Sequence, residues 1–202
     1  WRPALPPVGE FALLAADVGQ GNAVLVRTAS HALLYDAGPR YSLESDAGHR
    51  VLVPLLKALD TRLDRVVLSH RDTDHVGGAA AVLAMQPQAD LWSSLEAAHP
   101  LLAMRSGQRC EAGQHWEWDG VQFAVLHPRA EDYAGSARPN ALSCVLRISN
   151  GRQTALLVGD IEQAQEARLV VDATILKADL LLIPHHGSRT SSSGAFLDAV
   201  QP

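Results

Sequence analysis

The feature that most constrains the fold is a series of short apolar runs that each end in residues able to bind metal. Residues 66–68 form the run VVL, and the next ten residues read SHRDTDHVGG. This stretch contains four potential metal ligands, His70, Asp72, Asp74 and His75. A loop at the end of a buried strand is held by a rigid sheet, which makes it a favoured place for functional residues. We therefore predict a strand that ends in a metal-binding loop.

Two further apolar runs end in the same kind of residue. Asp160 closes the run ALLVGD, and His185 and His186 follow the run LLLIP. A lone aspartate before a helix is usually an N-cap, and adjacent histidines are by themselves weak evidence. Three such clusters at three predicted strand ends nevertheless favour one shared site. Imidazole and carboxylate together suit Zn, Mn or Fe, and ligands of this number can serve two adjacent ions.

The order of predicted elements is sheet, helices, sheet, helices. In the first half we expect strands at residues 11–17, 23–27, 32–36, 62–70 and 89–94, a polar loop at 39–50, and helices at 51–60 and 77–85. Residues 95–105 are ambiguous. In the second half we expect hairpins at 114–128 and 142–160, a helix at 161–170, a strand at 178–184 and a helix at 195–200. The pattern predicts one α/β domain over residues 1–202, an αββα sandwich of two mixed sheets with outer helices and a leading segment at 1–10.

Charge and hydropathy limit the partners of the chain. With 17 basic and 22 acidic side chains the formal net charge is -5, so bound metal or a local patch would have to attract a polyanion. The longest apolar stretch, residues 178–184, is too short to span a membrane. Cys110 and Cys144 lack any zinc spacing, and we expect buried thiols that pack in the core.

The chain does not begin with Met, which suggests a fragment of a longer protein. Four histidines are expected at the surface: His31, His49, His99 and His115.

The clusters carry a family resemblance. SHRDTDHVGG is similar to the HxHxDH signature of the metallo-β-lactamase fold, with Asp72 where the second histidine normally stands. Together with DVGQGNAVLV, LLYDAG, LLVGDIE and IPHHGSRTSSS, it resembles the soluble C-terminal domain of the ComEC family of DNA internalisation proteins, over residues 11–202. The resemblance implies a metallo-β-lactamase fold, two divalent ions and a nuclease that degrades the DNA strand that is not imported. It also implies an incomplete C-terminus, because relatives continue into another strand and a His-bearing loop.

The same resemblance assigns the ligands. His70 and Asp72 would hold one ion, Asp74 and His75 the other, and Asp160 would bridge or cap the pair. One of His185 and His186 would be the remaining ligand, and the sequence does not choose between them. A carboxylate in place of an imidazole at position 72 favours Mn²⁺, with Zn²⁺ as the alternative. His127, at the end of a predicted strand, is a further candidate ligand.

Other residues are assigned to the reaction and to the substrate. Asp74, His185 and Asn140 are the candidate catalytic residues, with either histidine of the pair as proton donor to the leaving oxygen. Asn140 and Ser143 match an Asn and Ser pair of the relatives and would contact substrate, and Ser188 could donate its hydroxyl to phosphate. Asp36 is expected to orient a ligand histidine from behind. Asn22 replaces the aspartate that commonly follows Gly-Gln-Gly, which weakens that position.

The resemblance also implies a cellular context. The partners would be DNA, single-stranded or duplex, and a transmembrane channel domain of the same polypeptide. The domain would be a soluble part of an inner-membrane protein, on the periplasmic or extracellular side. Two alternatives remain: another hydrolase on the same scaffold, such as a phosphorylcholine esterase or a lactonase, and a non-catalytic module that binds DNA or a partner.

Overall fold

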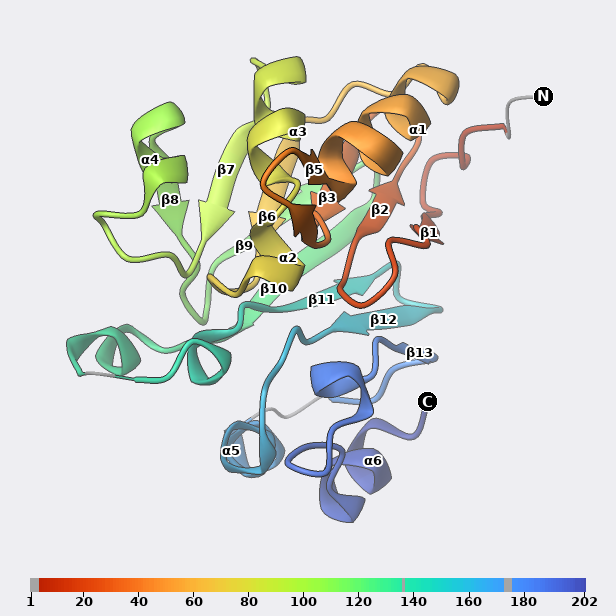
Figure 1. Ribbon diagram of the computed structural model, residues 1–202. Coiled ribbons are helices and arrows are strands. Elements are labelled where there is room, and N and C mark those ends of the chain that lie inside the picture. The colour runs from red at the N-terminus through yellow and green to blue at the C-terminus, as the bar shows by residue number, and fades with distance from the viewer. Residues whose placement is uncertain (1–3, 136, 173–175) are drawn as a thin grey trace. The chain divides into compact units, whose positions relative to one another are not determined.

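The computed structural model describes residues 4–135, 137–172 and 176–202 of the chain. The first three residues of the expected leading segment lie outside the described part. The chain divides into two compact units. The first unit contains the chain up to Arg109 together with Trp118–Gly120, and the second contains Cys110–Glu117 and the chain from Val121 onward. Each unit is built on a mixed sheet that carries its own helices (Figure 1).

The sheet of the first unit has six strands in the order β1-β2-β3-β6-β7-β8. Strands β1, β2 and β3 form the expected antiparallel meander, and β6, β7 and β8 continue parallel to β3. Parallel strands end at the same edge of a sheet, so the residues that follow β3 and β6 come to lie side by side. The bounds are β1 (Ala12–Ala15), β2 (Val24–Arg27), β3 (Ala32–Tyr35), β6 (Arg65–Leu68), β7 (Asp90–Ser93) and β8 (Gly107–Arg109).

The helices of the first unit pack on this sheet through a buried apolar core. Leu56 of α1 and Val82 of α3 belong to the same cluster as Leu34 of β3 and Leu68 of β6. Each buried aliphatic side chain of this kind contributes about 1.5–3 kcal/mol relative to an exposed one. The helical segments are η1 (Gly48–Leu52), α1 (Val53–Ala58), α2 (Thr73–Val76), α3 (Ala79–Met85) and α4 (Pro100–Met104).

Two expectations for the first unit are wrong in detail. Residues 39–50, expected as a polar loop, contain a small hairpin of β4 (Arg40–Ser42) and β5 (Ser45–Asp46). Its strands are too short and polar to give a periodic signal, and the Arg40 side chain supports the turn by donating hydrogen bonds to the carbonyls of Ser42 and Leu43. The second difference is that the metal-binding loop includes one helical turn, α2. The ambiguous stretch 95–105 contains α4.

The sheet of the second unit has five strands in the order β13-β12-β11-β10-β9. The predicted hairpin turn at Asn150-Gly151 is present. The Asn150 side chain stabilises it by accepting hydrogen bonds from the backbone of Arg152 and Gln153. Gly151 takes the positive φ, 81°, that such turns require. Strand β13 is only two residues long, shorter than the expected 178–184. The bounds are β9 (His115–Trp118), β10 (Val121–His127), β11 (Val145–Ser149), β12 (Thr154–Leu157) and β13 (Leu180–Leu181).

Two helices cover one face of the second sheet (Figure 1). Leu169 of α5 and Phe196 of α6 are buried in one cluster with Val145 of β11 and Leu156 of β12. The helical segments are η2 (Ala130–Ala134), η3 (Asn140–Leu142), α5 (Gln163–Asp172), η4 (Pro184–Gly187) and α6 (Gly194–Val200).

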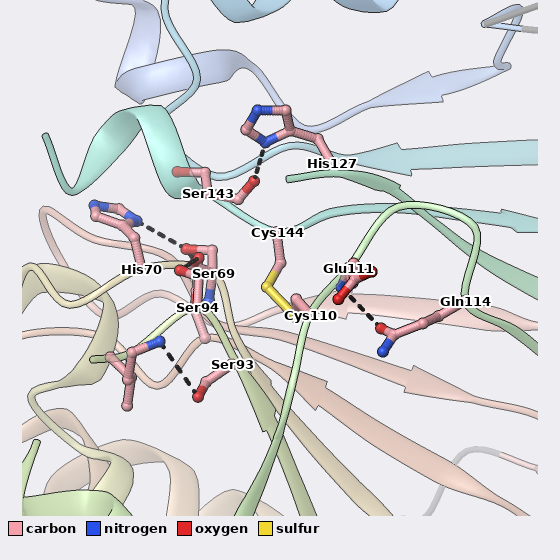
Figure 2. Close-up of a disulfide and its surroundings, with 12 residues drawn as sticks. Ser69, His70, Ser93, Ser94, Cys110, Glu111, Gln114, His127, Ser143 and Cys144 are labelled. Atoms are coloured by element: carbon pink, nitrogen blue, oxygen red, sulfur yellow. Dashed lines mark hydrogen bonds between the residues drawn. A yellow bond between two sulfur atoms is a disulfide. The ribbon is translucent and has the colours of Figure 1, made fainter. Parts of the chain in front are cut away.

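The prediction for the two cysteines is half wrong. Cys110 and Cys144 are buried as expected, but they form a disulfide with a Cα–Cα distance of 6.0 Å (Figure 2). The two residues are 34 apart in sequence. Two cysteines without a spacing motif do not reveal such a pair, because only the packing of the segment before β9 beside the start of β11 brings the sulfur atoms together.

Among the described residues, no helix has both the length and the apolar composition needed to cross a membrane.

Candidate functional site

The ligand candidates of the SHRDTDHVGG stretch lie after β6 and on α2. His70 follows the strand, Asp72 is the N-cap residue of the helix, and Asp74 and His75 lie within it. Both histidines are buried, whereas 44% of the Asp72 side chain and 29% of the Asp74 side chain are exposed. The imidazoles therefore come from the core and the carboxylates from the surface.

Asp36, at the end of β3, orients both imidazoles. Its buried carboxylate accepts hydrogen bonds from the backbone N–H of Ser69 (2.6 Å) and from the Ser69 hydroxyl (2.8 Å), and lies 2.7 Å from Nδ1 of His75. Because a carboxylate only accepts, His75 carries its proton on Nδ1 and its lone pair on Nε2. The Ser69 oxygen lies 3.0 Å from Nδ1 of His70 and accepts from it (Figure 2). Both rings thus offer Nε2 as the ligand atom, which supports the predicted role of Asp36.

Each imidazole is paired with one carboxylate. Nε2 of His70 lies 3.6 Å from Oδ2 of Asp72, and Nε2 of His75 lies 3.8 Å from Oδ2 of Asp74. Two atoms that bind one ion at about 2.0–2.2 Å each are roughly 3–4 Å apart. The two pairs therefore fit a divalent ion in spacing and in donor type.

The backbone packs unusually tightly around α2, and two glycines make this possible. A Cβ on Gly77 would lie 2.1 Å from the backbone nitrogen of Arg40, and a Cβ on Gly21 would lie 2.3 Å from the carbonyl oxygen of Asp74. Gly21 also has a φ of 141°. Any side chain at either position would displace the ligand helix. The Gly-Gly pair and the Gly-Gln-Gly turn of the sequence thus position the ligands.

The second unit carries the other ligand candidates. Asp160 follows β12 and is buried, and its Oδ2 lies 3.6 Å from Nε2 of His186 and 3.8 Å from Nε2 of His185. Asp74 and His75 in the first unit, and Asp160 and His186 in the second, each form a carboxylate–imidazole pair of the kind that holds metal. Both predicted members of the His185-His186 pair therefore face the predicted bridging aspartate.

The loop that carries the two histidines has a strained backbone. His185 and His186 have φ values of 48° and 50°, a region that residues other than glycine rarely adopt. Strain of this kind persists only where the surroundings hold it, and it is common at functional sites.

Glu166 is a functional candidate that the sequence reasoning missed. It is a fully buried residue of α5, and its carboxylate accepts hydrogen bonds from the backbone N–H groups of Ser192 (2.5 Å) and Ser193 (2.8 Å). Ser193 in turn caps α6. Glu166 therefore fixes the end of the histidine loop. A charged residue on the apolar side of an amphipathic helix is the only signal that could have indicated it.

His185 lies in a polar network of the second unit. Its Nδ1 is 3.2 Å from Oγ1 of Thr190, which donates to Glu162 at 3.2 Å. On the other side of the ring, Nε2 is 3.4 Å from Nδ2 of Asn140. The structure thus brings together two of the predicted catalytic residues, Asn140 and His185. Ser188 lies in the same loop, 3.2 Å from the Thr190 hydroxyl.

Ser143 and His127 support the backbone around Asp160. The buried Ser143 hydroxyl accepts from the N–H of Asp160 at 3.0 Å, and the Ser143 carbonyl accepts from Nδ1 of His127 at 2.9 Å (Figure 2). Nε2 of His127 is 3.7 Å from Asp132, whose carboxylate is held by Arg168. Burial lowers the pKa of His127 below its usual range, so the ring is neutral at pH 7. The roles of Ser143 toward substrate and of His127 toward metal remain predictions.

The geometry agrees with the comparison to known families. Residues 16–202 match the model of the metallo-beta-lactamase superfamily. This chain is a member of the metallo-β-lactamase superfamily. A metallo-β-lactamase from Cronobacter sakazakii has a similar structure, with a TM-score of 0.61 and 18% identity over 91% of this chain and 80% of that one. The predicted fold class is thereby confirmed.

The curated relatives of this metallo-β-lactamase domain include competence proteins. Competence protein ComA of Neisseria gonorrhoeae is 39% identical over 100% of this chain and 27% of its own length. Recombination protein 2 of Haemophilus influenzae is 34% identical over 92% of this chain and 22% of its own length. The chain therefore spans about a quarter of these relatives, and the resemblance to the competence family is confirmed. Superfamily membership points to divalent-metal binding and to a metal-dependent hydrolase, which the donor set of both units fits.

Proposed function

We propose that this domain is a metal-dependent phosphodiesterase that hydrolyses DNA as part of a competence DNA-uptake protein. The observation that carries the proposal is a chain-long similarity to competence proteins in a domain that has carboxylate–imidazole pairs in the loops and short helices after its strands. In this proposal the rest of the polypeptide forms a membrane channel, the domain lies on the periplasmic or extracellular side, and the strand that is not imported is the one degraded.

The chain offers ligands for two divalent ions, Mn²⁺ or Zn²⁺. His70 and Asp72 would hold one ion, Asp74 and His75 would hold the other, and Asp160 would supply a further carboxylate. We assign the last ligand position to His186, whose Nε2 lies 3.6 Å from Oδ2 of Asp160.

The remaining residues position the substrate and move protons. When bound, divalent ions supply Lewis-acid activation of the scissile phosphate. The Asn140 amide donates to a phosphate oxygen, and the hydroxyl of Ser188 donates to a second one. His185, held through Thr190 and Glu162, delivers a proton to the leaving oxygen. Binding through phosphate makes the hydrolysis independent of base sequence.

The test is hydrolysis of end-labelled single-stranded DNA, duplex DNA and a small phosphodiester by the protein loaded with Mn²⁺ or Zn²⁺. We expect cleavage of DNA, and its loss in the double variant Asp72→Asn/Asp160→Asn. Asp198→Asn, which changes an exposed carboxylate of α6 outside the ligand set, serves as the control.

Each alternative function predicts a different result. Cleavage of the small ester alone would identify another hydrolase on the same scaffold. DNA binding without turnover at any metal loading would identify a non-catalytic module. Full DNA cleavage by the double variant would contradict the proposed ligands.

A further inference from the structure

A hairpin next to the ligand helix exposes apolar surface that the fold does not use. Tyr41 and Leu43 of the β4–β5 hairpin are 42% and 85% exposed. Strand β4 packs against α2, which carries Asp74 and His75, and Figure 1 shows the hairpin beside that helix. Single exposed apolar residues are ordinary on protein surfaces, so what distinguishes these two is their place beside the candidate ligand helix.

The Tyr41 side chain is held in place. Its hydroxyl donates a hydrogen bond of 2.9 Å to the carbonyl of Val18, which begins the Gly-Gln-Gly turn. At the far end of that turn the N–H of Asn22 donates to the carbonyl of Asp74 at 3.3 Å. The ring is therefore tied through one short turn to the backbone of a predicted metal ligand, and the close approach of Arg40 to Gly77 ties the strand itself to α2.

The charges of the hairpin do not make it a basic patch. The guanidinium of Arg50 lies over one face of the Tyr41 ring, 5.5 Å from its centre, which leaves the opposite face for a base. The Arg40 side chain is bound to carbonyls of its own turn. Glu44 and Asp46 offset these two positive charges. A polyanion would gain little from general electrostatic attraction here, so recognition has to come from the aromatic face and the cation beside it.

We propose that the β4–β5 hairpin is a stacking platform on which Tyr41 binds a base of single-stranded DNA beside the ligand helix. This rests on the proposed DNA-hydrolase function. Aromatic side chains bind single strands because every base offers a face for stacking, whereas the bases of a duplex are already stacked on each other. The platform therefore selects single-stranded DNA without reading its sequence, and Arg50 strengthens the contact through its charge.

The experiment measures binding rather than turnover. Fluorescence anisotropy with a labelled oligothymidine and with an abasic oligonucleotide of equal length is recorded in Ca²⁺ and, separately, in EDTA. We expect wild type to bind oligothymidine more tightly than the abasic strand in at least one of the two buffers. Tyr41→Ala should weaken oligothymidine binding by about 5- to 100-fold, which is the usual contribution of one base–aromatic stack to affinity. Binding of the abasic strand should stay unchanged.

Three variants separate stacking from loss of fold. Tyr41→Phe keeps the ring and should keep most of the binding, while Tyr41→Leu keeps apolar bulk and should lose it. Val171→Ala removes an 84% exposed apolar side chain from α5 and should bind like wild type. Thermal unfolding of each variant checks that the hairpin substitutions leave the protein folded. A second readout is ultraviolet crosslinking of an oligonucleotide that contains 5-iodouracil, which should map to the peptide with residues 40–50.

The outcomes distinguish this inference from the function on which it rests. If wild type binds both oligonucleotides equally or not at all, or if Tyr41→Ala binds as wild type does, the platform is disproved even where DNA is cleaved. If binding depends on Tyr41 but no DNA is hydrolysed with any metal, the hydrolase proposal fails and the platform stands.

Discussion

At the scale of single residues, the candidate site depends on side chains that set the state of its ligands. Asp36 determines which nitrogen of His75 carries the proton, and through Ser69 it does the same for His70. Such partners raise metal affinity because they fix both the tautomer and the ring orientation before an ion arrives.

Asp36→Asn should weaken metal binding. Only one of the two terminal atoms of an asparagine amide accepts hydrogen bonds, so the contacts with Ser69 and His75 cannot all be kept. The His75 imidazole then loses its fixed tautomer. We expect affinity for Mn²⁺ or Zn²⁺ to fall by about 10- to 100-fold, measured by isothermal titration calorimetry. Asp46→Asn is the matched control, because it breaks a carboxylate–imidazole contact of 2.8 Å with His49, an exposed histidine outside the predicted ligand set. Equal affinities of the Asp36 variant and wild type would rule out the orienting role.

Asp119 supplies a pH-dependent contribution to stability. Its carboxylate accepts hydrogen bonds from the Thr28 hydroxyl (2.6 Å) and from the N–H and hydroxyl of Ser30 (2.7 and 2.8 Å). These bonds, that from Thr28 foremost, lower the pKa of Asp119 far below its usual range. A carboxyl group whose pKa falls on folding stabilises the protein above the pKa of the unfolded chain, near 4, and this contribution disappears as the pH falls through the folded-state pKa.

Asp119→Asn should therefore destabilise the protein at pH 7 by about 1 kcal/mol, a figure reduced for the solvent near this turn. The difference from wild type should shrink as the pH is lowered from 5 toward 2. Urea unfolding at a series of pH values measures it. A difference that stays constant with pH would contradict the assignment.

At the scale of elements, helix α5 anchors the histidine loop. Two glutamates one turn apart face that loop: Glu162 accepts from Thr190, and Glu166 accepts from the backbone at the start of α6. The left-handed backbone of His185 and His186 is held in place by such contacts and by the hydrogen bond of Ser191 to the Pro184 carbonyl.

Glu166→Gln should release this anchor. One amide nitrogen in place of a carboxylate oxygen leaves a half-buried backbone N–H without an acceptor, which costs about 1 kcal/mol. We expect faster amide hydrogen exchange in residues 185–193, measured by mass spectrometry. Asp198→Asn, an exposed carboxylate on α6, should leave the exchange unchanged. If the loop of Glu166→Gln exchanges its amide hydrogens as slowly as the loop of wild type, the anchor is dispensable.

At the scale of the whole molecule, each unit has its own sheet and core, and the disulfide belongs to the second. Cys144 follows Ser143, whose hydroxyl and carbonyl bind Asp160 and His127, and the disulfide joins this segment to the chain before β9. The disulfide thus closes a loop that includes β9, β10 and η3.

Removal of the disulfide should destabilise the second unit. Closing a loop of this length contributes up to about 3–4 kcal/mol through the unfolded chain. We expect Cys110→Ala/Cys144→Ala, and wild type in reductant, to unfold at lower urea concentration than oxidised wild type. Adding reductant to the double variant controls for other effects of the reductant. An unchanged midpoint on reduction would show that the cross-link does not contribute.

The sequence by itself indicated most of the strands, the turn at Asn150-Gly151 and the candidate ligands, because apolar runs, turn residues and short motifs are local properties of the chain. It also indicated the family through SHRDTDHVGG and IPHHGSRTSSS. Only the tertiary structure decided which nitrogens the histidines offer, that Glu166 anchors their loop and that Cys110 pairs with Cys144. These depend on residues far apart in the chain, and their hydrogen bonds and covalent links form only after the sheets bring them together.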